Sequence, residues 1–453
     1  MRLLFYSISG GDSARSKQSS RIEPFMKTYY TDVRKGRFAM DERAGIFKIL
    51  HISDLHLGKG LRSRDLAEDQ AHILSSIVRE TARLAPDLVL IAGDIFDRSI
   101  PSESAQTMFG RFMADLRRAL PFDGRILVIP GNHDSARRVA FAAELFEAVG
   151  IHLVSNVRPA PALVLEKGGK RAAVWALPFV THGAFHEFRR TWLDAADEFP
   201  ETGAGRMADH MASIIANLRP HFAEYDVNVL AAHCYVCGAE LSESDSAFIG
   251  GTEAVPASLF EPFDYVALGH LHRMQALFPH MWYSGAPMAM SFGDGGSDKN
   301  SDKGFLCVEI DAANGRLTVS PIALEPLRKM KRVRGSFSEL TKETPEPADQ
   351  DYIEVVLTDT DPVYNAFSEL AKRFPNLAGV QQEAFQKIAL GGAGDNLGPS
   401  AQSWLSLSRE RNVHAAVLED FRSFAKYILD EEPAEELVAA FEALIAEMAE
   451  ERE

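Results

Sequence analysis

The chain has 453 residues, 46% hydrophobic and 25% charged, which is ordinary for a globular protein of two or three domains. Three cysteines exclude a disulfide framework and suit a reducing cytosol. No apolar run approaches the ~20 residues of a membrane-spanning helix. The net charge of −16 counts against a protein that passively coats DNA. It does not exclude a nuclease, because bound cations offset the negative charge of acidic ligands, and a partner protein can supply part of the DNA-binding surface.

Residues 1–45 are polar and basic and have no clear period. We expect a disordered extension or a misassigned start there, with Met40 as a plausible true start. Beyond it, strand and helix patterns alternate. In chain order the patterns predict a strand at 47–53, a helix at 73–84, a strand at 87–92 and a helix at 102–120. The last of these helices begins at a serine cap.

Further apolar runs predict strands at 125–129, 226–232 and 264–268, and short alternating strands follow Trp282, with a turn at Asn314-Gly315. Residues 46–324 therefore predict one α/β sandwich. A break at Glu325-Pro326 opens a second unit. The expected segments after it are a small β-α-β capping domain at 325–390, a glycine-rich linker at 391–411, and a tail of two amphipathic helices at 412–453.

Five short polar motifs each follow a predicted strand. Loops at strand ends are where α/β sheets build their sites. Asp-x-His and His-x-His place two side chains on one side of an extended segment, because the strand period is two. Oxygen and imidazole ligands without thiolate suit manganese or iron. The motifs are Asp54-Leu-His56, Gly93-Asp94, Gly131-Asn132-His133-Asp134, His233, and Gly269-His270-Leu-His272.

Each motif alone is weak evidence, since a single histidine is more often a packed or exposed residue than a ligand. Their combination in this order points to a centre of two metal ions. Two ions ~4 Å apart need a bridging ligand, and Asp94 is the natural carboxylate for that position. Asn132 supplies a neutral amide oxygen. The remaining histidines receive no role: His72, His152, His182, His186, His210, His221, His280 and His414.

The motif set resembles the calcineurin-like metallophosphoesterase superfamily. More narrowly, residues 46–450 resemble the SbcD family, the nuclease subunits of bacterial SbcCD DNA-repair complexes. Four stretches carry the narrower likeness, and the last two are its specific ones. They are ILHISDLHLGKG (49–60), GAELSESD (238–245) with VPASLF (255–260), DYVALGHLHRMQ (264–275) and YSGAPMAMSFGD (283–294).

The resemblance implies a four-layer αββα sandwich and a role for each motif residue. Asp54, His56 and His272 would hold one metal, Asn132, His233 and His270 the other, and Asp94 would bridge them. His133 would orient the phosphate and protonate the leaving oxygen, while Asp134 would hold the tautomer of His133. The metals would be two divalent ions, manganese by expectation. A metal-activated water would attack in line.

The resemblance also implies the substrate and the partners. These are duplex or single-stranded DNA, a coiled-coil SMC-like ATPase of the SbcC type docked by residues 412–451, and a second copy in a homodimer. It places the protein in the cytoplasm at the nucleoid, with no membrane contact. The leading function is a manganese-dependent DNA exonuclease and endonuclease in DNA repair. The alternatives are a phosphatase or cyclic-nucleotide phosphodiesterase, which the 283–294 segment and the cap oppose, and a silent scaffold for an ATPase, which the complete ligand set opposes.

Three further signals remain open. Gly93-Asp-Ile-Phe-Asp-Arg98 is close to the phosphate-binding motif of protein phosphatases. Arg98 is expected to be a surface or ion-paired residue, and the alternative is a contact to a DNA phosphate. Cys234-Tyr-Val-Cys237 lacks the further ligands of a zinc site and is expected to be incidental. A basic cluster at the domain junction is either a solvated strand face or a contact to the DNA backbone. It comprises Arg328, Lys329, Lys331, Arg332 and Arg334.

Overall fold

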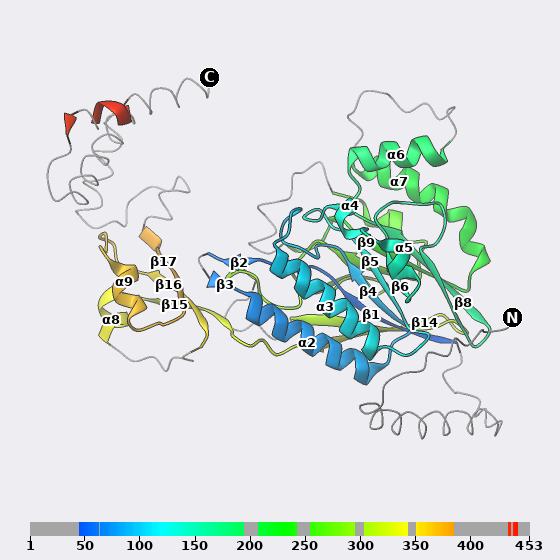
Figure 1. Cartoon of the computed structure of the whole chain (residues 1–453), viewed down its shortest axis with the longest axis horizontal. Coiled ribbons are helices and arrows are strands. Elements are labelled where there is room, and N and C mark those ends of the chain that lie inside the picture. Colours follow the sequence, from blue (N-terminus) through cyan, green and yellow to red (C-terminus); the bar gives the residue numbers. More distant parts are fainter. Residues whose placement is uncertain are drawn as a thin grey trace, which may run out of the picture.

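The computed structural model describes residues 45–62, 64–193, 207–241, 254–294, 303–342, 350–384, 434–435 and 438–442. It contains a larger α/β body and a smaller domain beside it (Figure 1). Below, the main domain means residues 46–324 and the cap means residues 325–384. Residues 1–44, the linker 391–411 and almost all of the tail 412–453 lie outside the described residues.

The main domain is built on two mixed six-stranded sheets, so the expected α/β fold is confirmed. In each sheet the central strands are parallel. The first sheet has the order β14 (Arg316–Ala323), β13 (Gly304–Asp311), β1 (Ile46–Ile52), β4 (Leu88–Ala92), β5 (Arg125–Ile129) and β6 (Ile151–Leu153). The second has the order β11 (Gln275–Phe278), β12 (Met281–Tyr283), β10 (Tyr265–Gly269), β9 (Val227–His233), β8 (Lys170–Leu177) and β7 (Leu163–Lys167). Antiparallel pairs lie at both edges of the second sheet, but in the first sheet only on the side of β13 and β14, since its other edge strand pairs parallel.

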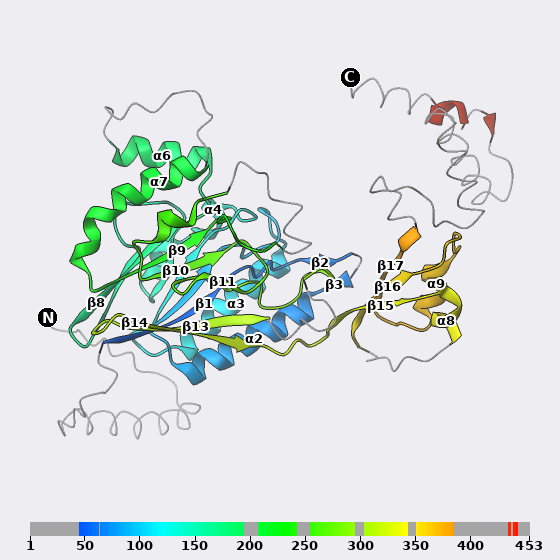
Figure 2. The ribbon, with the colours of Figure 1, turned by 180° about the vertical axis from the view of Figure 1, so that it is seen from behind.

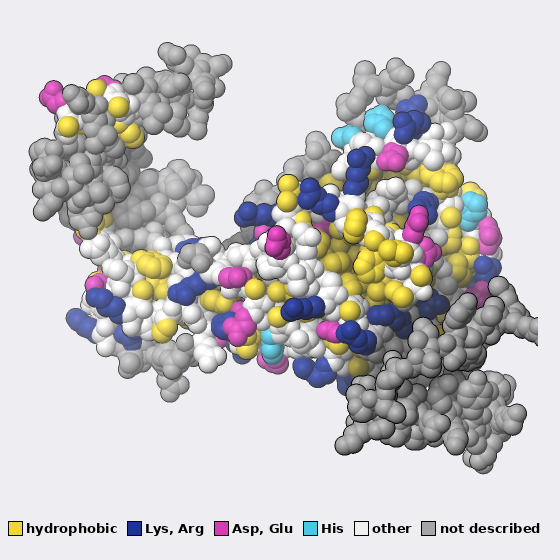
Figure 3. All heavy atoms as spheres, viewed as in Figure 1, with side chains coloured by type: hydrophobic (Ala, Val, Ile, Leu, Met, Phe, Trp, Pro, Cys, Tyr) yellow, Lys and Arg dark blue, Asp and Glu magenta, His cyan; other side chains and the backbone are white. Residues whose placement is uncertain are grey.

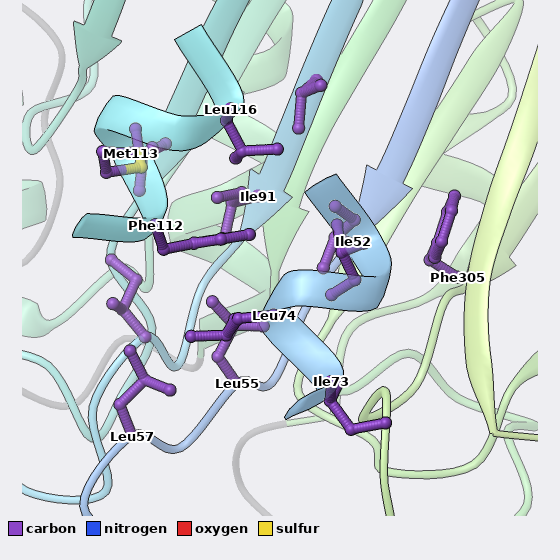
Figure 4. Packing of buried hydrophobic residues seen from close by; sticks show 14 of the residues in the cluster. Ile52, Leu55, Leu57, Ile73, Leu74, Ile91, Phe112, Met113, Leu116 and Phe305 are labelled. Atoms are coloured by element: carbon purple, nitrogen blue, oxygen red, sulfur yellow. The ribbon is translucent and has the colours of Figure 1, made fainter. Parts of the chain in front are cut away.

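The sheets pack face to face, and helices cover their outer faces (Figures 1 and 2). The apolar layer between the sheets includes Phe47, Leu90 and Val229. Helices α2 (Ala67–Leu84) and α3 (Glu103–Ala119) pack on the first sheet, with their apolar side chains against Ile52, Ile91 and Phe305 (Figure 4). Helices α6 (His182–Trp192) and α7 (Met207–Leu218) pack on the second sheet.

One buried histidine joins the two sheets. His51 on β1 is fully buried, and its ring nitrogens lie 2.9 Å from the Tyr265 hydroxyl and 3.1 Å from the Leu268 carbonyl oxygen on β10. Burial lowers the pKa of His51 to about 3. The ring is therefore neutral and acts as a polar link inside an apolar layer.

The cap contains one strand and one helix more than the predicted β-α-β unit. It is a parallel three-stranded sheet, β15-β16-β17, with two short helices. The basic cluster lies at its first strand, where the burial alternates as on a half-exposed strand face. The elements are β15 (Met330–Gly335), α8 (Phe337–Lys342), β16 (Tyr352–Leu357), α9 (Ala366–Ala371) and β17 (Leu377–Gln382).

The cap contacts the main domain through polar and apolar groups. Asp69, buried in the first turn of α2, accepts hydrogen bonds from the Tyr352 hydroxyl (2.8 Å) and the Arg328 guanidinium (2.8 Å). The hairpin β2 (Gly60–Leu61) and β3 (Arg64–Asp65) directly follows the first motif loop, and beside it Arg62 pairs with Glu354 of the cap. The chain that leaves the first motif is thus held by the cap.

Several short elements of the main domain were not predicted. They are β2, β3, β6 to β8, β11, α6, α7, α4 (Ala136–Val139), α5 (Ala143–Glu147), and the 3₁₀ helices η2 (Arg219–Glu224) and η4 (Ala257–Phe260). Among the described residues, no helix has the length and apolarity to cross a membrane.

Candidate metal centre

The first two motif loops are held together by backbone hydrogen bonds. The amides of Asp54 and His56 donate to the carbonyls of Gly93 (3.0 Å) and Asp94 (2.9 Å). Asp54, His56 and Asp94 all have positive φ values, of 55°, 42° and 49°. Such backbone costs about 1–3 kcal/mol per residue and persists only where the surroundings enforce it. Here the hydrogen bonds between the two loops enforce this backbone conformation. The conformation directs the three side chains toward one another.

Three motif glycines allow the loops to approach closely. A Cβ on Gly93 would lie 2.1 Å from His233 Nδ1, and one on Gly131 would lie 2.2 Å from Asp94 Oδ1. A Cβ on Gly269 would lie 1.8 Å from the carbonyl oxygen of Ala92. Each glycine is therefore required by the space that its neighbour occupies.

One group of candidate ligands surrounds His56. The Nε2 atoms of His56 and His272 lie 3.0 Å apart, and both side chains are almost fully buried. Asp54, also buried, accepts a hydrogen bond from the Ser53 hydroxyl, and its Oδ1 accepts one from the backbone amide of His270 (3.0 Å). The structure thus brings the rings of His56 and His272 into contact and holds Asp54 against the backbone of the His270 loop.

The second group surrounds the amide oxygen of Asn132. This oxygen lies 3.0 Å from His233 Nε2 and 2.9 Å from His270 Nδ1. The other ring nitrogen of His233, Nδ1, lies 2.8 Å from the carbonyl oxygen of Ala92, which fixes the ring so that Nε2 faces Asn132. This group therefore comes from the ends of three strands, β5 in the first sheet and β9 and β10 in the second.

Asp94 lies between the two groups. Its Oδ2 is 3.6 Å from His56 Nε2 and 3.5 Å from His233 Nε2, while its Oδ1 accepts the backbone amide of His133 at 2.9 Å. One carboxylate oxygen thus faces a histidine of each group. Asp94 is thus the carboxylate that contacts a proposed ligand in each group.

Burial and mutual charge set the protonation of this cluster. Burial alone would raise the pKa of Asp94, but His233, followed by His56, outweighs it and holds that pKa well below its usual range. Burial would lower the pKa of His233, but Asp94 raises it to about 9. Burial raises the pKa of Asp54 to about 6. Asp94 is therefore the carboxylate that is ionised over the whole physiological range.

The neighbours of His133 correct one expectation. Its ring Nδ1 lies 2.9 Å from the backbone carbonyl oxygen of Asp97, an acceptor that fixes Nδ1 as the protonated nitrogen. The Asp134 carboxylate instead accepts the backbone amides of Ile95 (3.0 Å), Phe96 (2.9 Å) and Gly131 (2.9 Å). Asp134 therefore ties two motif loops together, and the Asp97 carbonyl sets the tautomer of His133.

Two acidic residues at the site were not given a role from sequence. The Asp97 carboxylate lies 3.8 Å from His56 Nδ1 and accepts a hydrogen bond from Lys59 Nζ (2.8 Å). Asp294 is buried, with Oδ2 3.5 Å from His272 Nδ1. Among the described residues, two groups bring three metal-binding atoms within 4.8 Å of one another: Asp54, Asp94 and His233, and His56, Asp97 and His133.

The candidate DNA-binding residues have acidic neighbours. Arg98 is highly exposed, with Nε 3.8 Å from Asp97 Oδ2. In the basic cluster, the Arg328 guanidinium contacts Glu68 and Asp69, and the Lys329 backbone amide donates to Asp351 Oδ1 (2.8 Å). The other pairs are Lys331 with Asp351, Arg332 with Glu354, and Arg334 with Glu383. These pairs favour an ion-paired strand face over a phosphate-binding surface.

The cysteine pair offers no second centre. Cys234 is buried, and burial raises the pKa of its thiol to about 12, so it stays protonated. Cys237 is exposed. The incidental interpretation of this C-x-x-C remains the simpler one.

The donor set fits divalent metal ions. Two carboxylates, one amide oxygen and four imidazoles converge in a mostly buried site, and no thiolate is among them. His56 Nδ1 is buried and has no hydrogen-bond partner among the described residues. Oxygen and nitrogen donors in this proportion suit manganese, iron or zinc. Asp54, His56, Asp94, Asn132, His233, His270 and His272 are the residues that would hold the ions.

Comparisons with known proteins agree with this geometry. The calcineurin-like phosphoesterase family matches residues 47–274, and the "Type 5 capsule protein repressor C-terminal domain" matches residues 326–397. The SbcD component of the SbcCD nuclease of Staphylococcus epidermidis is 28% identical over 341 residues, which are 75% of this chain and 86% of that protein.

Two solved structures are also similar, each with 13% identity. A dimetal phosphatase from Danio rerio has a TM-score of 0.34 and covers 62% of this chain and 98% of its own. The protein TT1561 of Thermus thermophilus has a TM-score of 0.32 and covers 61% of this chain and 99% of its own. With half of its length matched by one family model, and with that family's expected ligands gathered in one site, the chain belongs to the calcineurin-like phosphoesterase family.

Proposed function

We propose that this chain is a manganese-dependent DNA nuclease that hydrolyses phosphodiester bonds at a centre of two metal ions. The observation that carries the proposal is the position of Asp94, whose Oδ2 lies 3.5–3.6 Å from one histidine of each ligand group. When bound, the ions would polarise a phosphoryl oxygen and lower the pKa of a bound water. The side chains of the site would hold the ions in position, offset their charge and donate a proton to the leaving oxygen.

The first group, Asp54, His56 and His272, would hold one ion, and the second, Asn132, His233 and His270, would hold the other. His133 would act on the substrate. Its Nδ1 is committed to the Asp97 carbonyl at 2.9 Å, so Nε2 is the nitrogen that would donate a proton to the leaving oxygen. Its backbone amide donates to Asp94 Oδ1, which ties the position of the acid to the bridging carboxylate.

DNA is favoured over other phosphoesters by the similar relative and by the cap. The relative that spans three quarters of this chain is named as part of a nuclease, and the cap region matches a second family model. A cap held beside the first motif loop by Arg62 and Arg328 provides a wall that a small phosphate ester does not need. We infer a polynucleotide substrate on these grounds.

The same relative belongs to a multi-subunit complex by its name, and we propose an SMC-like ATPase as the partner of this chain, in the cytoplasm at the nucleoid. The docking segment would be the tail 412–451, which lies almost wholly outside the described residues. A chain ending at Gly398 should still cleave small substrates with manganese but fail to co-purify with the ATPase. Equal binding of the ATPase by the shortened chain would contradict this role of the tail.

We also propose that two copies of the chain form a homodimer. Support comes from an apolar surface around α5, where Phe141, Leu145 and Val149 are 79%, 76% and 54% exposed beside a groove lined by Phe109 and Phe146. Leu145→Asp should give a monomer in sedimentation velocity. Tyr364→Asp, at an 84% exposed aromatic of the cap, is the matched control. A parental mass for Leu145→Asp would exclude this surface as the interface.

The central test is a substrate panel. The purified full chain with manganese would be given duplex DNA, single-stranded DNA, a chromogenic phosphodiester and a phosphopeptide. Cleavage of DNA that is lost in Asp94→Asn supports the proposal. Turnover of the phosphopeptide without cleavage of DNA would assign a phosphatase, and inactivity on every substrate would favour a scaffold.

A further inference from the structure

A second set of histidines lies outside the active site, on helices α6 and α7. The two helices run side by side on the outer face of the second sheet in both ribbon views (Figures 1 and 2). His182 and His186 are four residues apart on α6, and His210 lies on α7. Histidine side chains gather over α6 and α7 in the space-filling view (Figure 3).

The rings of His182 and His210 are arranged like ligand pairs of the metal centre. Their centroids are 4.9 Å apart with an interplanar angle of 87°. In the metal centre, His56 and His272 have the same centroid separation of 4.9 Å at 67°, and their Nε2 atoms lie 3.0 Å apart. The pair on α6 and α7 therefore has the ring separation found among the histidines of the metal centre, where His56 adopts it with both His272 and His133.

His210 has the character of a ligand rather than of a packed core residue. Its side chain is only 6% exposed, and Phe185 stacks on its ring at 4.0 Å. Its Nδ1 is buried and has no hydrogen-bond partner among the described residues. A buried nitrogen left in this state is unfavourable, because it has lost its hydrogen bonds to water without replacement. That cost is removed if a ligand engages the ring.

His182 and His186 both lie near this ring. Burial lowers the pKa of His210, and the neighbouring His182 and His186 lower it further. The ring is therefore neutral at physiological pH, which is the form that binds metals. His182 and His186 are exposed, and residues at i and i+4 are neighbours on one face of a helix. The three rings do not bring three ligand atoms within 4.8 Å of one another in this structure, so His186 would have to change its rotamer to complete a site.

We propose that His182, His186 and His210 form a second metal site, separate from the two-metal centre, that binds a zinc-like divalent ion. Two histidines at i and i+4 on one helix are a recognised zinc-binding arrangement. Imidazole ligands alone suit zinc, nickel or copper better than manganese. With three protein ligands and an exposed face, the fourth position would be taken by water. The ion would fasten α6 to α7.

The experiment uses the full, tag-free chain after removal of metals by a chelator. Zinc is titrated by calorimetry into Asp94→Asn, in which the active site is weakened, and into Asp94→Asn with His182→Ala and His186→Ala. We expect the first protein to bind one zinc per chain more than the second, since the remaining active-site ligands are the same in both. In the second, the affinity should fall more than about 100-fold, since even a lost partner of a ligand costs about 10–100-fold.

His182 and His186 are chosen because exposed residues can be changed without disturbing the core, whereas His210→Ala would empty the stack on Phe185. His221→Ala, at an exposed histidine on η2 that pairs with Glu224, is the matched control and should leave zinc binding unchanged. Zinc should also raise the Tm of Asp94→Asn by more than it raises that of the variant lacking both histidines. Equal zinc affinity in these two proteins, or no zinc bound by Asp94→Asn, would overturn the proposal. Neither result bears on the nuclease activity.

Discussion

Gly131→Ala should disable the metal centre through a single methyl group. The added Cβ would lie 2.2 Å from Asp94 Oδ1 and 2.4 Å from Asp94 N, whereas ordinary contact begins at 3.4 Å. The bridging carboxylate must therefore move by about 1 Å, and a misplacement of that size can cost about 100-fold in rate. Because Asp94 faces both ligand groups, we expect manganese to bind more weakly at both sites.

The assay measures kcat on duplex DNA at saturating manganese, together with calorimetric titration of the metal. Gly110→Ala is the matched control, since a Cβ there meets no atom within 4 Å. It lies inside α3, where alanine should stabilise the helix by about 0.5–1 kcal/mol. If Gly131→Ala keeps the parental rate and both manganese affinities, the tight packing of this loop against Asp94 is not what positions the carboxylate.

Three further predictions concern the site and its support. His133→Ala should keep both metals in elemental analysis but lose about 10²–10⁴ in rate, and loss of metal would make His133 a ligand. Asp94→Asn should weaken two manganese sites in calorimetry and Asp54→Asn mainly one, so equal damage to one site in both variants would contradict the bridge. His51, with its pKa lowered to about 3, stays neutral in the fold while the unfolded chain takes up a proton below pH 6.5. Stability is therefore lost as pH falls from about 6.5 towards 3, by about 2 kcal/mol at pH 5. In urea unfolding, His51→Gln should show that much less loss between pH 7.5 and 5, and parallel pH profiles would refute it.

The sequence could locate the motifs because each follows a strand that is mostly apolar. Such runs identify β1, β4 and β9 without reference to the rest of the chain. It could not predict the backbone of the loops. Asp54 and Asp94 have positive φ, which favours glycine, and only the hydrogen bonds between the two loops hold them there. Those bonds form between residues about 40 positions apart.

The elements that sequence patterns missed are short or have mixed composition. Strands β7 and β8 form a hairpin whose turn, Gly168-Gly169, has φ values of 58° and 76°. A Gly-Gly pair between two strand-forming runs is a recognised hairpin signal, so this pair of strands could have been predicted. The strand β15 was hidden by its charges, because its exposed face carries the basic cluster that pairs with acidic residues far away in the sequence.

The roles of the acidic residues near the ligands also depended on tertiary structure. Asp134 follows His133 directly, and the family resemblance implied that it orients that ring. Its carboxylate instead lies among three backbone amides, because a buried carboxylate is stabilised by several donors. Asp97 orients His133 through its backbone carbonyl, a contact that no residue type can signal.

Asp294 is the further residue on which the first ligand group should depend. It ends the segment 283–294, its side chain is fully buried, and its Oδ2 lies 3.5 Å from His272 Nδ1. A carboxylate behind a ligating histidine fixes the ring and raises its basicity, and its loss typically costs about 10–100-fold in metal affinity.

Asp294→Asn should therefore weaken manganese binding by about this factor at the site that includes His272 and spare the other. Asp294 Oδ2 also accepts the backbone amide of Met290 at 3.0 Å, and an asparagine oxygen can keep that bond. The asparagine variant thus tests the loss of the negative charge alone. Asp294→Ala also loses the contact to the Met290 amide, so it should weaken manganese binding further. Two calorimetric sites with parental affinity in Asp294→Asn would show that His272 is oriented by the fold alone, without help from this carboxylate.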